Sequence, residues 1–379
     1  MGAAMEKGEF RQIAHSGGQI TIKTITQPDG RRLYQLTFQH NRPVGSAFFA
    51  VHVIPPGLPV ATAQLGGLGS PIDPGPVPGN LMVYIVSDSE MMWGAECPRC
   101  SAYWRSNSPS KCCVSCGLRG EPHLFLTAAH GAYIQQYCSL FALAQDAPDG
   151  EHVIDLDAVA DAVESVEKPP FYYAEESQQN KFTCATCGCV VDILGKFGYC
   201  CRCGTRNDLQ ELDKTLDAIR TRINSEGAKH EDCVRDAVAA FDSFVGQYVR
   251  ELVKRVPMTR SRINRLENSR FHNVNLVRDE LKSTFDIDVF DGIDAKDHGF
   301  AVMMFLRRHV YEHNGGEADE EYISQSGDAS VRIKQALRET QESAHRTVGT
   351  VMRMAKNLHD GFHGIFPPDE ETIRMHKRR

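Results

Sequence analysis

Apolar and polar residues alternate near the start of the chain, with the period of two that half-buried strands show. The alternation runs through residues 18–25 and again through 31–38, and Gln-Pro-Asp-Gly at 27–30 separates the two segments. Asp-Gly between two alternating segments is typical of the tight turn of a β-hairpin. The pattern therefore predicts two antiparallel strands joined by this turn.

Two further apolar runs extend the β-rich pattern toward residue 95. Residues 47–54 and 81–88 are each long enough for a buried strand and are rich in Val, Ile, Phe and Tyr. The stretch 56–80 between them is rich in Gly and Pro, so we expect a loop or linker there. Residues 9–95 are predicted to form a β-rich N-terminal domain, and the sequence indicates no catalytic set of side chains in it.

From about residue 208 the apolar period becomes that of an α-helix, as in Leu209, Leu212 and Leu216. Segments with this period follow one another at 208–224, 231–256, 273–285, 296–313 and 331–358. Long amphipathic helices joined by short loops predict an antiparallel bundle over 208–379. The basic residues 374–379 at its end are expected to be disordered.

Residues 96–207 contain two cysteine clusters with a helical spacer between them. Residues 127–145 and 155–167 have helical patterns, and the second begins with Asp155 as an N-cap and ends before Pro169. The predicted fold is a multidomain α+β protein. It comprises the N-terminal β-rich domain, two zinc ribbons with their helical spacer, and a C-terminal all-α bundle.

Composition places the chain among ordinary globular proteins, with 379 residues, 41% hydrophobic and 24% charged, enough for two or three domains. The net charge of −7 argues against a protein that coats nucleic acid indiscriminately, although a local basic surface is compatible with it. The N-terminal residues lack the apolar core of a signal peptide, and prolines and glycines interrupt the most apolar region, 45–69. We therefore expect a cytoplasmic protein without membrane spans.

Thirteen cysteines in a chain without a secretion signal suggest metal binding rather than disulfides. Eight of them form two tetrads of paired Cys-x-x-Cys motifs: Cys97, Cys100, Cys113 and Cys116, and Cys184, Cys187, Cys200 and Cys203. Thiolates fill all four positions of each tetrahedral site, so we predict two structural Zn²⁺ ions. Cys112 and Cys201 lie beside ligands and leave the choice between Cys112 and Cys113, and between Cys200 and Cys201, open. Such ribbons either contact nucleic acid or protein partners or serve only as small cores.

A charged cluster ends the helix predicted over 296–313. Arg308, His309 and His313 follow an apolar helical face, which anchors the end of the helix in the core. His309 and His313 are four residues apart and therefore share one face. Asn314 and two glycines then stop the helix. Other Arg and His residues recur at similar spacing in this chain, so spacing alone carries little weight.

The residues around this cluster make the pattern more specific. Asp319 and Tyr322 follow as Asp-x-x-Tyr, and with the Arg-His cluster at 308–313 they resemble the motif of the HEPN superfamily of helical-bundle proteins. The resemblance covers about residues 208–360. It implies a metal-independent endoribonuclease that forms a homodimer in which two motifs face each other, and many active members serve as toxins or in defence against phage. Members without cleavage activity act as adaptors or binding modules.

The residue types suit RNA cleavage because RNA carries its own nucleophile, the 2′-hydroxyl. His313 would move a proton to or from the reacting oxygens, and Arg308 would hold the phosphate and stabilise its charge. His309 is expected to be a second acid, base or phosphate ligand, and Asn314 to orient a histidine or contact RNA. The products would be a 2′,3′-cyclic phosphate and a 5′-hydroxyl, with no metal required.

A bland interpretation of the same residues pairs Arg308 with Glu312 one turn along the helix and leaves His313 as a solvated helix end. The alternative function is then a non-catalytic, zinc-ribbon nucleic-acid-binding or adaptor protein with a HEPN dimerisation domain. Residues 250–270 carry seven Arg or Lys against two Glu, a local excess in an acidic chain. Three arginines of this stretch are candidate RNA contacts: Arg260, Arg262 and Arg265. A protein or nucleic-acid trigger is expected to bind the N-terminal half.

Overall fold

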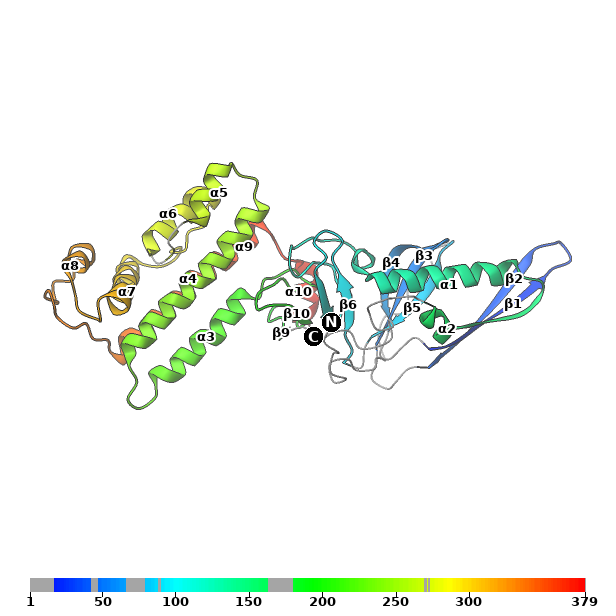
Figure 1. Cartoon of the computed structure of the whole chain (residues 1–379), viewed down its shortest axis with the longest axis horizontal. Helices are drawn as coiled ribbons and strands as arrows, with labels where there is room; N and C mark the ends of the chain where they lie inside the picture. Colours follow the sequence, from blue (N-terminus) through cyan, green and yellow to red (C-terminus); the bar gives the residue numbers. More distant parts are fainter. Residues whose placement is uncertain are drawn as a thin grey trace, which may run out of the picture. The chain divides into compact units, whose positions relative to one another are not determined.

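The structure is a computed structural model of the whole chain, shown in Figure 1. It describes residues 17–41, 47–65, 79–87, 90–162, 180–268, 271 and 273–378. The chain divides into two compact units. The first contains residues 1–205 and 369–379, and the second contains residues 206–368. No helix in the described ranges is long and apolar enough to cross a membrane.

The predicted hairpin is confirmed as strands β1 (Gly17–Thr26) and β2 (Arg32–Asn41), which pair antiparallel across the turn. Strand β8 (Gly150–Asp155) pairs with the other edge of β1 and completes a three-stranded sheet. Ile20 and Ile22 of β1 are fully buried, while β2 is largely exposed. The period-two pattern therefore points one face of β1 into the core.

The second sheet has the order β4-β3-β5, and two of its strands match the apolar runs in the sequence: β3 (Phe48–Ile54) and β5 (Leu81–Val86). Strand β4 (Leu58–Leu65) lies within residues 56–80, so the expectation of a loop throughout that stretch is wrong. Pro59 reaches the ladder beside a register shift, where a missing N–H is tolerated. Residues 66–78 of the expected loop lie outside the described residues.

The predicted helical spacer appears as α1 (Ala128–Asp146) and α2 (Leu156–Asp161). Asp155 caps α2 as expected, and residues 163–167 of that prediction lie outside the described range. Although α1 lies between the cysteine clusters in sequence, its buried residues pack against the two N-terminal sheets. The shared core includes Ile20, Ile22, Val51, Val83, Ile85, Tyr133, Ile134, Tyr137 and Phe141.

A third, four-stranded sheet carries the cysteine tetrads and has the order β6-β7-β10-β9. Its strands are β6 (Trp93–Glu96), β7 (Tyr103–Ser106), β9 (Asn180–Thr183) and β10 (Val190–Ile193). The last helix, α10 (Glu370–Lys377), packs against this region through Ile373. The expectation of a disordered tail is therefore wrong for residues 374–378, because Asp369 caps the helix and Ile373 reaches an apolar core.

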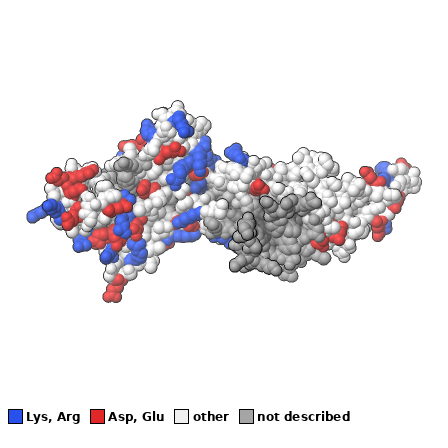
Figure 2. All heavy atoms as spheres, in the orientation of Figure 1, with Lys and Arg blue, Asp and Glu red and all other residues white. Residues whose placement is uncertain are grey.

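The second unit is all-helical, and its longest helices pack together side by side (Figure 1). These are α3 (Asp208–Ile223), α4 (His230–Arg255), α7 (Ala295–His313) and α9 (Gln341–Ile365). Shorter helices border them: α5 (Arg260–Glu267), α6 (Val274–Phe285) and α8 (Glu320–Ser326). Phe241, Val245 and Leu358 are fully buried between the long helices. On the face shown in Figure 2, side chains of both charges are mixed over this unit.

Helix α9 begins at Gln341, ten residues after the predicted start at 331. Thr340 and Ser343 form a capping box that fixes this start. The preceding segment is held against the end of α7, since Leu337 packs with Val310 and Tyr322 and its N–H donates to the Gly316 carbonyl. Competing tertiary contacts thus override the helical period of residues 331–340.

Candidate functional site

The Arg-His cluster lies on the last turns of α7, where Val310 is buried and anchors the helix. His309 and His313 are both exposed, and their ring centroids are 4.7 Å apart. Arg308 lies beside them, and its Nη2 forms an ion pair with Oε2 of Glu312 at 2.7 Å. The cluster therefore brings two imidazoles and one guanidinium together. The pairing of Arg308 with Glu312 is the one that the non-catalytic interpretation of the sequence expects.

The neighbouring Arg307 points the other way, into a buried network that sequence reasoning missed. Its Nε donates to the Tyr322 hydroxyl at 3.0 Å, Nη1 to Glu339 at 3.0 Å and Nη2 to Asp328 at 2.9 Å. Tyr311 donates to the same Glu339 oxygen at 2.6 Å. The helical period could have revealed this arrangement, because adjacent residues on a helix face directions about 100° apart.

Charge inside this network is compensated. Burial raises the pKa of Asp328, but hydrogen bonds from Ser330, Arg307 and Tyr322 outweigh it and lower the pKa to about 2. Asp328 therefore stays ionised beside the Arg307 guanidinium. Arg307 is fixed by these partners, whereas Arg308 has Glu312 as its ion-pair partner.

The residues after the cluster build the turn into α8. Asn314 ends α7, and its Nδ2 donates to Oδ2 of Asp319 at 2.5 Å, so it holds the turn rather than a histidine. The other oxygen of Asp319 accepts from the Tyr322 N–H at 2.7 Å and caps α8. Gly315 and Gly316 both have positive φ, which permits the tight reversal. The Asp-x-x-Tyr sequence thus has a structural role here.

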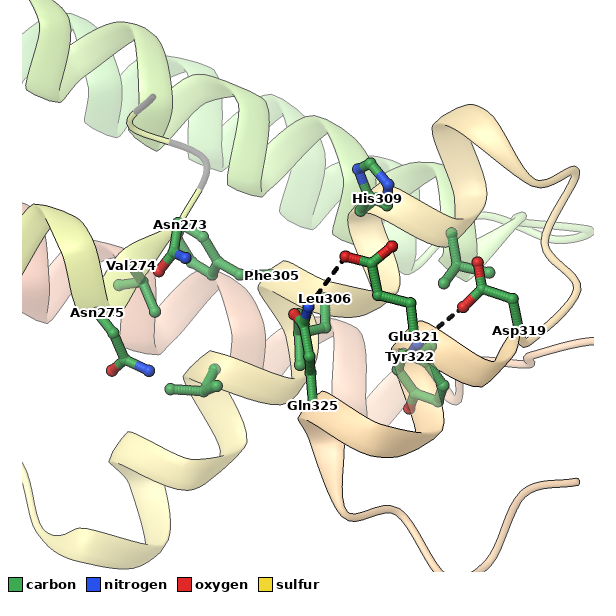
Figure 3. A pocket seen from close by; sticks show the side chains of 12 residues that line it. Asn273, Val274, Asn275, Phe305, Leu306, His309, Asp319, Glu321, Tyr322 and Gln325 are labelled. Atoms are coloured by element: carbon green, nitrogen blue, oxygen red, sulfur yellow. Dashed lines mark hydrogen bonds between the residues drawn. The ribbon is translucent and has the colours of Figure 1, made fainter. Parts of the chain in front are cut away.

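A groove of about 470 Å³ opens between α6, α7 and α8, and His309 is one of its lining residues (Figure 3). Phe305, Leu306 and Val310 supply apolar lining from α7. The groove brings His309 of the predicted site together with polar residues of α6 and α8, while Arg308 and His313 lie outside its lining.

The basic candidates lie on α5, where Arg260, Arg262 and Arg265 are all exposed. Arg265 forms an ion pair with Glu280 at 3.1 Å. Within the described part of the chain, Arg260 and Arg262 have no ion pair. These two arginines are therefore the ones that α5 leaves available to an anionic partner.

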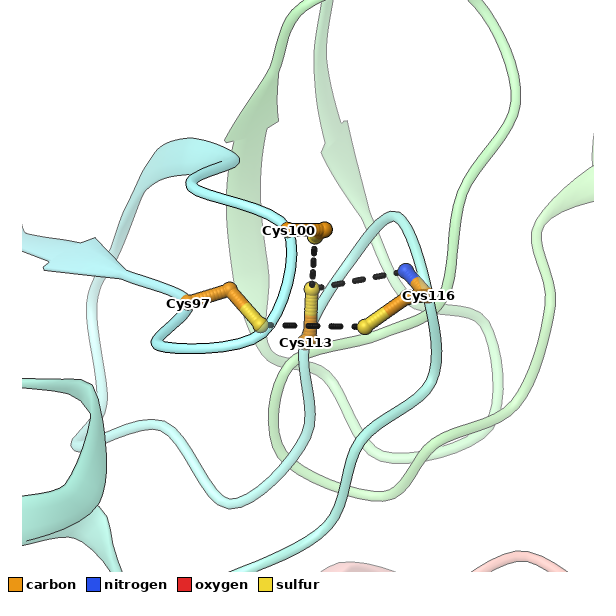
Figure 4. Close-up of side chains that lie close together, drawn as sticks. All are labelled: Cys97, Cys100, Cys113 and Cys116. Carbon is orange, nitrogen blue, oxygen red and sulfur yellow. Dashed lines mark hydrogen bonds between the residues drawn. The ribbon is translucent and has the colours of Figure 1, made fainter.

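Each cysteine tetrad brings its sulfur atoms within 4.8 Å of one another, as Figure 4 shows for Cys97, Cys100, Cys113 and Cys116. In this tetrad, the Cys97–Cys116 and Cys100–Cys113 sulfur pairs are 3.7 Å apart. A tetrahedron with Zn–S bonds of about 2.3 Å has edges of about 3.8 Å. The sulfur positions therefore fit a zinc ion.

The second tetrad fits equally well, with sulfur distances of 3.8 Å between Cys184 and Cys203 and 3.5 Å between Cys187 and Cys200. The structure places Cys113 and Cys200 in the tetrads, and Cys112 and Cys201 outside them. The Cys201 sulfur instead lies 3.8 Å from that of Cys189.

The two ribbons repeat each other. Strands β9 and β10 lie 87 residues after β6 and β7, and each ligand cysteine of the second tetrad lies 87 residues after its counterpart. Backbone hydrogen bonds repeat as well, since Cys97 N–H donates to Ala102 and Cys184 N–H donates to Cys189 at 2.9 and 2.8 Å. The identical spacing of two, twelve and two residues within each tetrad is the signal that reveals this repeat in the sequence.

An approximate two-fold axis relates the ribbons where β7 pairs antiparallel with β10. Arg105 lies opposite Asp192 in this ladder, and these residues also occupy equivalent positions in the two ribbons. Both side chains are buried, with Arg105 Nη1 3.5 Å from Asp192 Oδ2 and Nη2 2.7 Å from Glu90. A paired charge therefore lies on the axis that joins the ribbons.

The two tetrads differ in how far the protein shields their cysteines from solvent. All four cysteines of the second tetrad are buried, whereas Cys100 is exposed and Cys116 is half-buried in the first. Helix α10 covers the second tetrad. A Cβ added to Gly188 would lie only 2.5 Å from Cε1 of the His376 ring on this helix. Gly188 also has a φ of +69°, so a side chain there would be strained twice over.

Comparison with known proteins adds no relative: no family model, curated protein or solved structure matches this chain.

Proposed function

We propose that the helical unit carries half of a metal-independent endoribonuclease site, which a second copy of the chain completes. The observation that carries this proposal is the pair of exposed imidazoles of His309 and His313, 4.7 Å apart beside Arg308. They extend from a helix whose other face is anchored in the core, which gives catalytic groups a fixed geometry. The resemblance of this segment to the HEPN superfamily supports the same function.

The reaction needs one neutral and one protonated imidazole. One histidine takes the proton of the 2′-hydroxyl, whose oxygen then attacks the phosphorus. The P–O5′ bond breaks, and a second histidine gives its proton to the departing oxygen. The products are a 2′,3′-cyclic phosphate and a 5′-hydroxyl. Two facing copies of His313, assisted by His309, supply both roles.

Arg308 binds the phosphate after exchanging its partner. Glu312, its partner in the ion pair, has a side chain that is 40% exposed. The Arg308 side chain itself is only 13% exposed, so a phosphate that replaces Glu312 has to supply charge-assisted hydrogen bonds that compensate for the carboxylate it displaces. The geometry supports Arg308 for this role because Arg307 is held by buried partners.

Each cysteine tetrad holds one structural zinc ion in this proposal. Four thiolates leave no open coordination position, so these ions stabilise the ribbons and take no part in cleavage. The β-rich and ribbon half binds the trigger that regulates the ribonuclease, in the manner of a toxin or antiviral effector. This biological setting rests on the family resemblance.

The test is RNA cleavage in buffer without added divalent cations, with the 2′,3′-cyclic phosphate end as the readout. Arg308→Ala and His313→Ala are each expected to lower the rate at least 100-fold, because a general acid or base contributes about 10²–10⁴-fold and a donor that stabilises the developing charge about 10²–10³-fold. His345→Ala is the matched control, since His345 lies on α9 and bonds Asn224. RNA left intact by a dimeric wild type, or cleaved equally by all variants, contradicts the proposal.

A second candidate function is non-catalytic RNA binding, and the unpaired arginines of α5 favour it. Arg260 and Arg262 are exposed and have no ion pair within the described residues. In that case binding weakens steeply with salt, survives His313→Ala and is lost in the double variant Arg260→Ala, Arg262→Ala. Cleavage that depends on His313 rules this candidate out as the whole function.

A further inference from the structure

The groove beside His309 has walls of different chemistry (Figure 3). Its volume of about 470 Å³ lies in the range of small-molecule pockets, roughly 300–1,000 Å³. Val302 and Leu306 in its lining are apolar and half-buried, and Val274, Phe305 and Val310 are apolar and buried. Flat aromatic ligands bind such surfaces through their faces and reach polar groups at the walls with their edges.

The wall formed by α8 offers hydrogen-bond acceptors. Oε1 of Glu321 accepts from Nε2 of Gln325 at 2.9 Å. This bond leaves Oε2 of Glu321 and the amide oxygen of Gln325 without a partner among the described residues. Both side chains are exposed toward the groove, as Figure 3 shows. A ligand edge with adjacent N–H donors therefore matches this wall.

The wall formed by α6 offers hydrogen-bond donors. Oδ1 of Asn273 accepts from the Leu276 N–H at 3.1 Å, and Oδ1 of Asn275 lies 3.1 Å from Nε2 of His298. Their oxygens are thus engaged by the protein, and the two Nδ2 groups remain free within the described part of the chain. A ligand edge with acceptors matches this wall.

The charge of the lining excludes a phosphate from the groove itself. Asp319 and Glu321 are acidic, and among the residues that the structure describes no lysine or arginine lines the groove. Within the described part of the lining, His309 is the residue that can carry a positive charge, and it also belongs to the Arg308 cluster. A nucleotide would therefore place its base in the groove and its phosphate outside, at the histidines.

We propose that this groove binds a guanine base, and that it selects the nucleotide next to the cleaved phosphate. Guanine presents N1–H and N2–H₂ as adjacent donors, which match the Glu321 carboxylate and the Gln325 oxygen. Its O6 and N7 are acceptors and match the amide groups of Asn273 and Asn275. The position beside the cleaved phosphate rests on the proposed ribonuclease function, whereas base binding does not.

The other bases match only part of this pattern. Adenine has N6–H₂ but an acceptor at N1, which would face the carboxylate of Glu321. Uracil has a single ring donor, at N3, and cytosine lacks a ring N–H donor. An unpaired acceptor pressed against a carboxylate costs free energy because both groups lose water without gaining a hydrogen bond. The groove therefore discriminates by chemistry rather than by size.

The experiment is calorimetric titration of the full chain with GMP, AMP, CMP and UMP, which differ only in the base. GMP is expected to bind at least tenfold more tightly than the others, a difference of about 1.4 kcal/mol. Glu321→Gln is expected to remove this preference, and Asn275→Ala to reduce it from the opposite wall. Glu320→Gln is the matched control, because Glu320 lies on the same helix, is exposed and does not line the groove.

Equal affinity for the four nucleotides overturns the proposal, and so does wild-type GMP binding by Glu321→Gln with its fold intact by circular dichroism. The two functional ideas fail separately. GMP selectivity without any RNA cleavage leaves the base site standing and removes the ribonuclease. Cleavage dependent on His313 at all sequences alike, without GMP selectivity, removes only the guanine site.

Discussion

The cysteine ribbons and the end of α7 carry motifs of similar length, yet the fold uses them differently. In each ribbon every cysteine of the tetrad turns toward one point, with sulfur atoms within 4.8 Å of each other. On α7 the side chains of the adjacent Arg307 and Arg308 are similarly buried, 12% and 13% exposed, but they make different contacts. Arg307 enters a network with Asp328 and Glu339, and Arg308 pairs with Glu312 beside His309. Residue spacing in the sequence identifies a site when all its residues bind one atom. On a helix, the face on which a residue lies determines which partners its side chain contacts.

The largest expected difference between the two regions follows removal of metal. Structural zinc contributes about 10–16 kcal/mol of apparent binding free energy, so a chelator that extracts it should unfold the ribbons while the helical unit stays folded. Both tryptophans of the chain, Trp93 and Trp104, lie in the first unit, and Trp104 is fully buried beside the tetrads. Trp93 packs in the core of the N-terminal sheets, so Trp104 is the fluorophore that reports on the ribbons, and the far-ultraviolet circular dichroism at 222 nm reports mainly on the helices.

Restoring Zn²⁺ should restore the fluorescence, which separates metal loss from irreversible damage. An unchanged emission maximum after complete loss of zinc, measured colorimetrically, would show that the ribbons hold their fold by packing alone.

A smaller difference in the free energy of unfolding is expected between variants of the two adjacent arginines of α7. Arg307→Ala leaves Asp328 and Glu339 charged, buried and unpaired, and should lower the free energy of unfolding of the helical unit by about 3–5 kcal/mol. Arg308→Ala leaves only Glu312 without its partner, and because that side chain is 40% exposed water can hydrate it, so the loss should be smaller than for Arg307→Ala. Urea denaturation followed at 222 nm measures both, and equal losses would refute the division of roles between them.

The last effect, which builds up gradually with pH, concerns acid. Burial, with a further contribution from His363, lowers the pKa of His359 to about 3, against about 6.5 in the unfolded chain. Between these values the unfolded state binds the proton and the folded state does not, so stability falls as pH decreases from 6.5 toward 3. The loss is at most about 1.4 kcal/mol per pH unit.

Thermal unfolding of the helical unit between pH 7 and 4 tests this expectation. His359→Phe should flatten the pH dependence, while His345→Ala should leave it as in the wild type. Equal slopes in wild type and His359→Phe would mean that another group controls the acid response.

Regular patterns in the sequence predicted the tetrads, the β1–β2 hairpin and the long helices, because local chemistry suffices for these. It does not suffice where tertiary contacts decide. Strand β4 was hidden in a Gly/Pro-rich stretch and exists because β3 offers it a ladder. Residues 331–340 have a helical period, but Leu337 packs against the end of α7 instead. The inward turn of Arg307 depends on Glu339, which is 32 residues distant along the chain.

The charged pair between β7 and β10 has a consequence for which ribbons can associate with each other. A residue on a two-fold axis faces its own equivalent, so two identical first ribbons joined in this way would bring Arg105 against Arg105. Two identical second ribbons would bring Asp192 against Asp192. Like charges buried at one point are strongly unfavourable, whereas the observed Arg105–Asp192 pair is compensated. Each ribbon thus prefers the other to a copy of itself, and the interface selects heterotypic pairing of a first ribbon with a second ribbon.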